Sequence, residues 1–186
     1  MKLNKQIDLI KENFFKNQFL AEIYNRYDEI NLPNWYLGAG CIAQTIWNVF
    51  SGFAPNVNIK DVDIAYFDSS DLSKKSEELK EKEIQKKFKS LPIKFDVKNQ
   101  ARVHLWYKDC FGYDIQPYSS VENAINTWPT TATSLGMKKE NDNFVLYSPH
   151  GLSDLLDMVV RPNKAQITKE IQRWKECWPK LKIVSW

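Results

Sequence analysis

Two aspartates separated by a single residue are the side chains of this sequence best suited to do chemistry. Asp61 and Asp63 flank Val62 in residues 59–67, an apolar run typical of a strand. Because side chains alternate between the faces of a strand, both carboxylates should share one face, with Cα atoms roughly 6–7 Å apart. Like charges at that separation are costly unless a cation lies between them, and Mg²⁺ takes such oxygen ligands together with substrate phosphates. The spacing therefore predicts a metal and nucleotide site.

A glycine turn about twenty residues upstream could hold the phosphates of such a nucleotide. The run from Gly38 to Cys41 follows an apolar segment that ends at Leu37, and residues 41–50 have the apolar spacing of a helix. Glycine permits a tight turn and close approach of a ligand, while the helix would direct unpaired N–H groups and a positive dipole end at the turn. We expect a phosphate-binding turn between a strand and a helix.

A third carboxylate lies on a long alternation of apolar and polar residues. Residues 93–107 alternate in this way, and Asp96 falls on the polar face. The pattern predicts an antiparallel type of strand, or a pair of strands, with one core face. Asp96 could therefore join the aspartate pair. The same polar face carries Lys94, Lys98, Gln100, Arg102 and His104.

The remaining segments supply the elements that must position these groups. We expect helices over residues 5–29, with a possible break near Asn17, and over the charge-rich residues 71–89, interpreted as a solvated face. Later elements are a short helix opened by a capping box at 119–122, hairpin strands at 130–137 and 144–147, a helix over 152–161, and a last helix with Ile167, Ile171, Trp174 and Trp178 on one stripe. His104 and His150 lack partners at the spacing of a metal site or a catalytic triad, and we interpret both as structural.

Length and composition favour a single α+β domain, with a mixed, mostly antiparallel sheet flanked by helices. The 186 residues are 43% hydrophobic and 13% aromatic, which is enough for a core. We divide the domain 1–186 into an N-terminal helical region (1–32), a catalytic core (33–163) and a C-terminal helix (164–186). The net charge of +3 is too small to indicate a dedicated nucleic-acid binder.

Cysteine usage and hydropathy indicate a soluble cytoplasmic protein. Cys41, Cys110 and Cys177 have neither the spacing of a disulfide framework nor that of a zinc site. The N-terminus lacks the apolar core of a signal peptide, and no stretch approaches a membrane span. We expect no membrane association, and the sequence implies no stable partner chain.

Two other interpretations of the glycine turn and the aspartate pair are weighed against the metal site. Residues 38–43 also fit the dinucleotide-binding fingerprint, with Asp68 as the acid that ends the next strand. That interpretation leaves the acids at the start of the strand, and the alternating segment that follows, unexplained. The aspartates could also be plain charges at an exposed sheet edge. The combination of strand, glycine turn, helix and third acid favours the metal site.

The order of these motifs resembles the polymerase-β-like nucleotidyltransferase superfamily. The motifs that carry the resemblance are Leu37-Gly38-Ala39-Gly40-Cys41, Asp61-Val62-Asp63-Ile64 and Phe95-Asp96-Val97. Residues 38–163, about two thirds of the chain, look more closely like a group of small bacterial nucleotidyltransferases similar to the head domain of CCA-adding enzymes. The stretches 98–106, 128–132 and 160–163 add to this match.

The resemblance implies a nucleotidyltransferase fold and a metal-dependent reaction. Asp61 and Asp63 would bind two Mg²⁺ ions, and Asp96 would join one of them and help to activate an attacking hydroxyl. A nucleotidyl group would move from a nucleoside triphosphate to that hydroxyl, with release of pyrophosphate. The residues implied to contact the nucleotide are Gly38, Ala39, Gly40 and Cys41, with Arg102, Thr130 and Thr131 as further contacts to the triphosphate or sugar.

The sequence departs from the family pattern in two places. Many members have Ser where Cys41 stands, and a thiol is a weak donor. The Arg-Arg-Asp run of the CCA-adding head domain has no counterpart near residues 126–131, so no base preference is implied. The acceptor, whether a small molecule, RNA or protein, stays open. The alternatives are a catalytically silent nucleotide-binding or regulatory module of the same fold, and an Asp-x-Asp glycosyltransferase that uses a nucleotide sugar.

Overall fold

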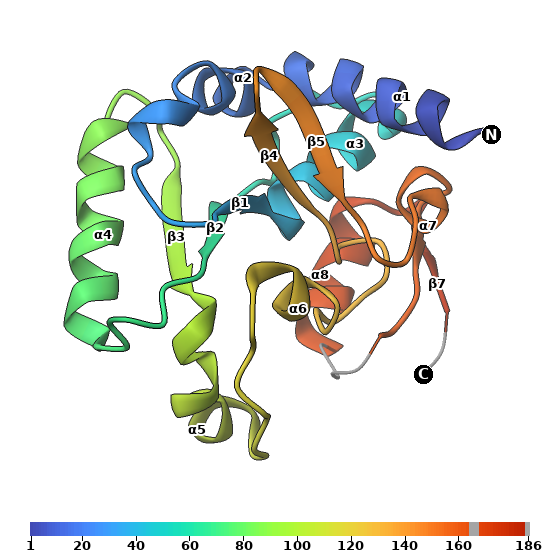
Figure 1. Cartoon of the computed structure of the whole chain (residues 1–186). Coiled ribbons are helices and arrows are strands. Elements are labelled where there is room, and N and C mark those ends of the chain that lie inside the picture. Colours follow the sequence, from blue (N-terminus) through green and yellow to red (C-terminus); the bar gives the residue numbers. More distant parts are fainter. Residues whose placement is uncertain (164–167, 185–186) are drawn as a thin grey trace.

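A five-stranded sheet forms the centre of the molecule (Figure 1). The computed structural model describes residues 1–163 and 168–184. The strands lie in the order β3, β2, β1, β4, β5; the β2–β3 pairing is parallel and the other three pairings are antiparallel. The mixed, mostly antiparallel sheet predicted from the sequence is therefore confirmed. The strands are β1 Tyr36–Gly38, β2 Asp61–Tyr66, β3 Lys94–Asn99, β4 Gly136–Glu140 and β5 Asn143–Tyr147.

Helices flank this sheet, and a small second sheet lies near the C-terminus. The helices are α1 Leu3–Lys16, α2 Gln18–Asn25, α3 Ala39–Ser51, α4 Lys74–Lys87, α5 Tyr107–Phe111, α6 Val121–Ile125, α7 Ser153–Leu156 and α8 Thr168–Cys177, with the 3-10 helices η1 Tyr27–Glu29 and η2 Gln100–Leu105. The second sheet pairs β6 Val159–Val160 in parallel with β7 Lys182–Ile183. Within the described residues, none of the helices has both the length and the apolar character that crossing a bilayer requires.

One face of the main sheet carries the hydrophobic core. Leu37, Ile64 and Val97 come from the adjacent strands β1, β2 and β3 and are all at most 1% exposed. They belong to one cluster with Ile42 of α3 and Phe14 of α1, and these two helices are in contact with each other. Burying a side chain of this size stabilises the fold by about 1.5–3 kcal/mol. This face therefore holds β1, β2 and α3 in fixed relative positions.

The opposite face of the sheet is only partly covered. Helix α6 packs Val121 and Ile125 against Tyr36 and Ala65. Because side chains alternate along β2, Asp63 shares this second face with Ala65 and points away from the core. The uncovered part of the face is therefore the part that carries carboxylates.

The alternation over residues 93–107 does not form one continuous strand, and that prediction is wrong beyond Asn99. Strand β3 ends there, and residues 100–105 form η2. Asn99 causes the change, because its side-chain oxygen accepts a hydrogen bond from the N–H of Ala101 at 3.1 Å and so caps the new helix. The expected antiparallel pairing is also wrong, since β3 runs parallel to β2.

The C-terminal part contains less helix than the sequence predicts. The helix expected over residues 152–161 is limited to α7, because Met158 adopts a left-handed backbone conformation with φ 55° and β6 follows. Helix α8 does form, with Trp174 6% exposed and Trp178 fully buried just beyond its end. Ile167, expected on the same stripe, lies outside the described residues.

The predicted break at Asn17 and the predicted hairpin are confirmed, although the hairpin begins later than expected. The Asn17 side chain accepts a hydrogen bond from the N–H of Phe19 at 3.0 Å and caps α2. In the hairpin, Asn141 and Asp142 both have positive φ, 49° and 60°, which suits the two-residue turn between twisted strands. Residues 130–135 precede β4 as turns instead of belonging to it.

Candidate functional site

Three residues on neighbouring strands form a row across the open face of the sheet. Gly38 of β1 pairs with Asp63 of β2, and Asp63 pairs with Asp96 of β3. Adjacent strands lie about 4.8 Å apart, so the row spans about 10 Å between the outer Cα atoms. Asp61, two residues before Asp63 in the same strand, points to the same face. We call Asp61, Asp63 and Asp96 the carboxylate row. The structure thus brings together the glycine turn and the three carboxylates that the sequence singled out.

The glycine turn leads directly into helix α3. Gly38 is the N-cap residue, and no side chain caps the first turn of the helix. Ala39 has a positive φ of 40°, which is uncommon for a residue other than glycine and typical of strained functional segments. A Cβ atom built on Gly40 would lie 3.4 Å from the Oδ2 atom of Asp63. The N-terminal end of α3, with its positive dipole end, therefore faces the carboxylate row, an arrangement that can bind phosphate.

Asp63 has a strongly perturbed carboxyl group. Burial raises its pKa to about 7, and the charges of Asp61 and Asp96 add to the rise. The N–H of Gly40 and the ammonium group of Lys98 oppose this rise without cancelling it. A carboxyl group in such surroundings is protonated more readily than an ordinary one, unless a cation binds beside it.

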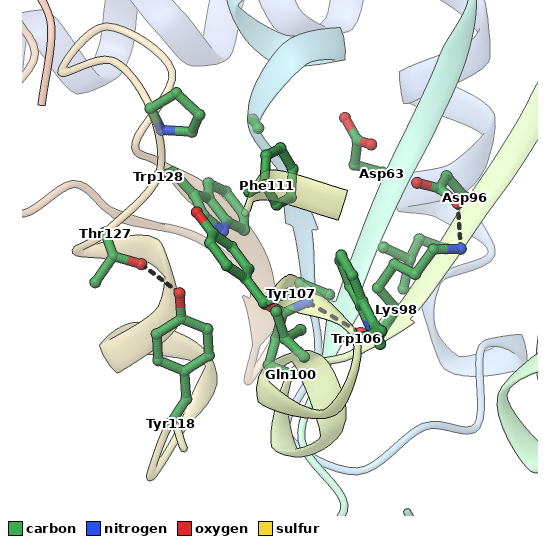
Figure 2. Close-up of a pocket in the computed structure, with 15 residues that line it drawn as sticks. Asp63, Asp96, Lys98, Gln100, Trp106, Tyr107, Phe111, Tyr118, Thr127 and Trp128 are labelled. Carbon is green, nitrogen blue, oxygen red and sulfur yellow. Dashed lines mark hydrogen bonds and ion pairs between the residues drawn. The ribbon is translucent and has the colours of Figure 1, made fainter. Parts of the chain in front are cut away.

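Lys98 holds the side chain of Asp96. Its ammonium group forms an ion pair with Asp96 (Figure 2) and lies 3.2 Å from the Oε2 atom of Glu81. Burial alone would lower the pKa of Lys98, but the two carboxylates outweigh it and raise that pKa. A charged amine therefore lies at the edge of the carboxylate row.

The carboxylate row has the donor chemistry of a divalent-cation site. Asp61 and Asp63 offer paired oxygen donors, and burial, with the charges of Asp61 and Asp96, raises the pKa of Asp63. In residues 1–163 and 168–184, no three His, Cys, Asp or Glu side chains are arranged to enclose a metal ion as they stand. Asp96 would have to leave Lys98 to complete such a set. The residues therefore fit a hard cation held first by Asp61 and Asp63.

A cavity of about 420 Å³ opens beside the row (Figure 2). Ala39, Asp63 and Asp96 contribute to one side of it, and its volume falls in the range of about 300–1,000 Å³ usual for small-molecule pockets. The aromatic side chains that line it are Trp106, Tyr107, Phe111, Tyr118 and Trp128. Trp106 lies between η2 and α5, Tyr107 and Phe111 belong to α5, and Tyr118 and Trp128 lie on either side of α6 in the sequence. The cavity thus has an acidic part and an aromatic part.

Two residues implied to contact the nucleotide have their side chains engaged elsewhere. The thiol of Cys41 is 1% exposed and donates to the carbonyl of Gly38 at 3.3 Å, and burial raises its pKa. Arg102 forms an ion pair with Glu77 at 2.6 Å, and both side chains are less than 10% exposed. Cys41 can therefore contact a phosphate at the turn only through its backbone. Arg102 is not among the residues that line the cavity.

The two threonines proposed as further contacts also have structural partners. Thr130 is fully buried and shares a hydrogen bond of 2.8 Å with Thr133. The hydroxyl of Thr131 donates to Asp154 at 2.6 Å. Neither threonine is among the residues that line the cavity.

Sequence reasoning missed several residues that line the cavity. The sequence predicts Lys98 on the polar face beside Asp96 but gives it no role in the site, and it includes Trp106 and Trp128 only within the stretches 98–106 and 128–132. The sequence feature that could have indicated these residues is the high density of aromatic residues between Asp96 and Trp128. Periodicity alone assigned this segment to strands and turns. Lys98 belongs to β3, Trp106 follows η2, and Trp128 lies between α6 and β4, so three separate segments bring them to the site.

We expect the substitution Gly38→Ala to damage the site through Trp128. A Cβ atom on Gly38 would lie only 2.8 Å from the Cη2 atom of the Trp128 ring, so the indole or the strand must shift. Overpacking of this kind costs about 1–3 kcal/mol. The loss should appear as a lower urea midpoint with an unchanged slope.

The variant Trp128→Leu supplies the control, because it removes the ring that the new Cβ would meet. In that background, Gly38→Ala should cost less than about 1 kcal/mol, which a double-mutant cycle measures. An equal cost in both backgrounds would show that contact with Trp128 is not the reason for glycine at this position.

The fold and the order of the motifs have parallels among known proteins. Residues 25–183 match the sequence profile of a family described as nucleotidyltransferase. A solved structure, described as an NMR structure that reveals a CCA-adding enzyme head domain, aligns with a TM-score of 0.77 and 26% sequence identity over 95% of each chain. A search of curated proteins finds no match. The range matched by the profile contains the glycine turn, the three carboxylates and the cavity.

Proposed function

The chain belongs to the nucleotidyltransferase family that matches residues 25–183, and from this premise we propose that it transfers a nucleotidyl group from a nucleoside triphosphate to an acceptor hydroxyl. The observation that carries the proposal is the row of Gly38, Asp63 and Asp96 across adjacent strands. In this row the glycine turn, which would bind the phosphates, lies beside the paired carboxylates. Phosphoryl transfer depends mainly on such positioning and on neutralisation of charge.

In the proposed reaction, the oxygen of the acceptor hydroxyl attacks the α-phosphorus while the bond from that phosphorus to the departing pyrophosphate breaks. The N–H groups at the start of α3 bind the triphosphate. Lys98 exchanges Asp96 for a phosphate oxygen, and the freed Asp96 carboxylate accepts the proton of the attacking hydroxyl. Before this exchange, the ion pair holds the side chains of Lys98 and Asp96 next to each other.

Asp61 and Asp63 are the residues that would hold the divalent cation, and Mg²⁺ suits their oxygen donors. When bound, the cation would supply charge neutralisation at the reacting phosphate. It would also keep the Asp63 carboxylate ionised, which burial otherwise opposes.

Thermal unfolding with nucleotides tests the proposal. We expect at least one of ATP, CTP, GTP and UTP to raise the Tm in the presence of Mg²⁺, because a ligand that binds only the folded state stabilises it by about 2.7 kcal/mol at 100 times its Kd. For a chain of this size that corresponds to roughly 5–10 °C. The double variant Asp61→Asn/Asp63→Asn should lose the shift.

The control for this experiment is Asp8→Asn, at an exposed position on α1, which should keep the full shift. The triphosphate that binds is then tested for pyrophosphate release with small-molecule hydroxyl acceptors and with RNA. No Mg²⁺-dependent shift with any triphosphate, or a shift that survives in the double variant, would contradict the proposed site.

A further inference from the structure

The part of the cavity away from the carboxylates is rich in aromatic rings. Trp106 lies between η2 and α5, and Tyr107 and Phe111 belong to α5. The ring centroid of Tyr107 is 6.2 Å from that of Trp106 and 4.5 Å from that of Phe111. Tyr118 and Trp128 line the cavity from the segment that surrounds α6 (Figure 2). Phe111 remains 50% exposed, so an aromatic face is left open to a ligand.

The hydroxyls of Tyr118 and Thr127 and the side-chain amide of Gln100, which lie in this part of the cavity, already have hydrogen-bond partners within the protein. The hydroxyl of Thr127 lies 2.7 Å from that of Tyr118 and donates to the carbonyl of Ala124 at 2.9 Å. The side-chain amide of Gln100 donates to the carbonyl of Lys98 at 3.2 Å. The cavity therefore offers ring faces more than unpaired donors. Such a surface suits a flat ring and suits a polyhydroxylated sugar poorly, since sugar hydroxyls would lose water without gaining partners.

We propose that the aromatic part of the cavity binds a planar heteroaromatic base by stacking against Trp106 and Phe111. The proposal rests on the proposed function, because the carboxylate row at the other side of the cavity is where the phosphates of a nucleotide would bind. Stacking of a base on an aromatic side chain is worth about 1–3 kcal/mol, and it tolerates every base because each has a π face. The acidic part and the aromatic part would then bind the two ends of one nucleotide, or the donor and the acceptor side by side.

Binding of nucleosides, which carry the base but no phosphate, tests this proposal separately from the metal site. Adenosine, guanosine, cytidine and uridine are titrated into the full chain by calorimetry, and tripolyphosphate with Mg²⁺ is titrated in parallel. We expect at least one nucleoside to bind, and Trp106→Leu and Phe111→Leu each to weaken it by 5-fold or more, which corresponds to the lower end of the stacking range. Tripolyphosphate binding should change by less than 2-fold in both variants.

Phe53→Leu is the matched control, because Phe53 is 43% exposed, as Phe111 is 50% exposed, and does not line the cavity. It should leave nucleoside binding unchanged. Phe111→Leu, at a half-exposed position, keeps the test valid if Trp106→Leu fails to fold. A nucleoside that competes with the intact triphosphate would identify the base of the donor as the occupant, and one that binds alongside it would identify the acceptor.

Failure of every nucleoside to bind would overturn the proposal, as would binding that neither variant weakens. The separate measurement with tripolyphosphate keeps this failure distinct from that of the proposed function. Retained binding of tripolyphosphate with Mg²⁺, without any binding of nucleosides, would remove the base-stacking role and leave the phosphate and metal site standing.

Discussion

Replacing Asp63 with Asn is expected to stabilise the metal-free protein at pH 8 by about 2–4 kcal/mol and to lower the rate of the proposed nucleotidyl transfer by a factor of at least about 100. Burial raises the pKa of Asp63 to about 7, with Asp61 and Asp96 adding to the rise. For an acid whose pKa is raised by folding, ionisation penalises the folded state. The penalty starts as the pH rises past the unfolded pKa near 4 and is complete above about 7. Asparagine avoids it at every pH.

Melting temperatures in EDTA at pH 5 and pH 8 measure this effect. At pH 8 the variant should melt roughly 4–16 °C above the wild type, and the difference should shrink at pH 5, where Asp63 is protonated in the folded state. The exposed Asp8→Asn variant controls for the loss of one negative charge. A variant that melts below the wild type at pH 8 would show that Asp63 is not under electrostatic strain, and would remove that argument for a cation at this position.

The arrangement of the carboxylate row could be predicted in part from the sequence. The two-residue period of a strand placed Asp61 and Asp63 on one face, and the apolar neighbours of Asp96 placed it on a polar strand face. Their alignment with Gly38 could not be derived, because it depends on the strand order β3, β2, β1 and on a parallel β2–β3 pairing. Periodicity states which face a residue occupies but not which strand lies beside it.

The aromatic part of the cavity escaped prediction for a local reason. A regular alternation continues past Asn99, so the period of a strand persists where the chain has become η2. The hydrogen bond from the N–H of Ala101 to the Asn99 side chain outweighs that pattern. As a result, Trp106 and Phe111 lie beside the carboxylates instead of further along a sheet.

Arg102 shows how a distant partner changes the interpretation of a charged residue. The family resemblance made it a possible contact to the triphosphate or sugar, and Glu77 belonged to a helix interpreted as a solvated face. In the structure, Glu77 is 6% exposed and Arg102 is 7% exposed, and the two form an ion pair across 25 positions of sequence. Hydropathy could not reveal this pair, because each residue taken alone is typical of a surface.

The second large effect is therefore expected at this buried pair, where Arg102→Met should destabilise the protein by about 3–5 kcal/mol. Arg102 donates to Glu77 at 2.6 Å and to the carbonyl of Leu72 at 3.1 Å, while the second oxygen of Glu77 accepts from the N–H of Asn99 at 2.7 Å. The pair thus connects α4 to the end of β3. Removing the guanidinium group leaves a carboxylate buried without its counter-charge, and denaturant unfolding measures the loss.

Two further variants show whether burial of an unpaired charge is the cause. Glu77→Gln in the Arg102→Met background removes that charge but keeps a carbonyl oxygen for the N–H of Asn99, so at least about 1 kcal/mol should return. Arg161→Met breaks a pair with Asp154 in which the arginine is 50% exposed, and it should cost less than about 1 kcal/mol. If Arg102→Met costs no more than Arg161→Met, the buried pair does not stabilise the fold. If it instead abolishes triphosphate binding in a protein that remains folded, Arg102 belongs to the nucleotide site after all.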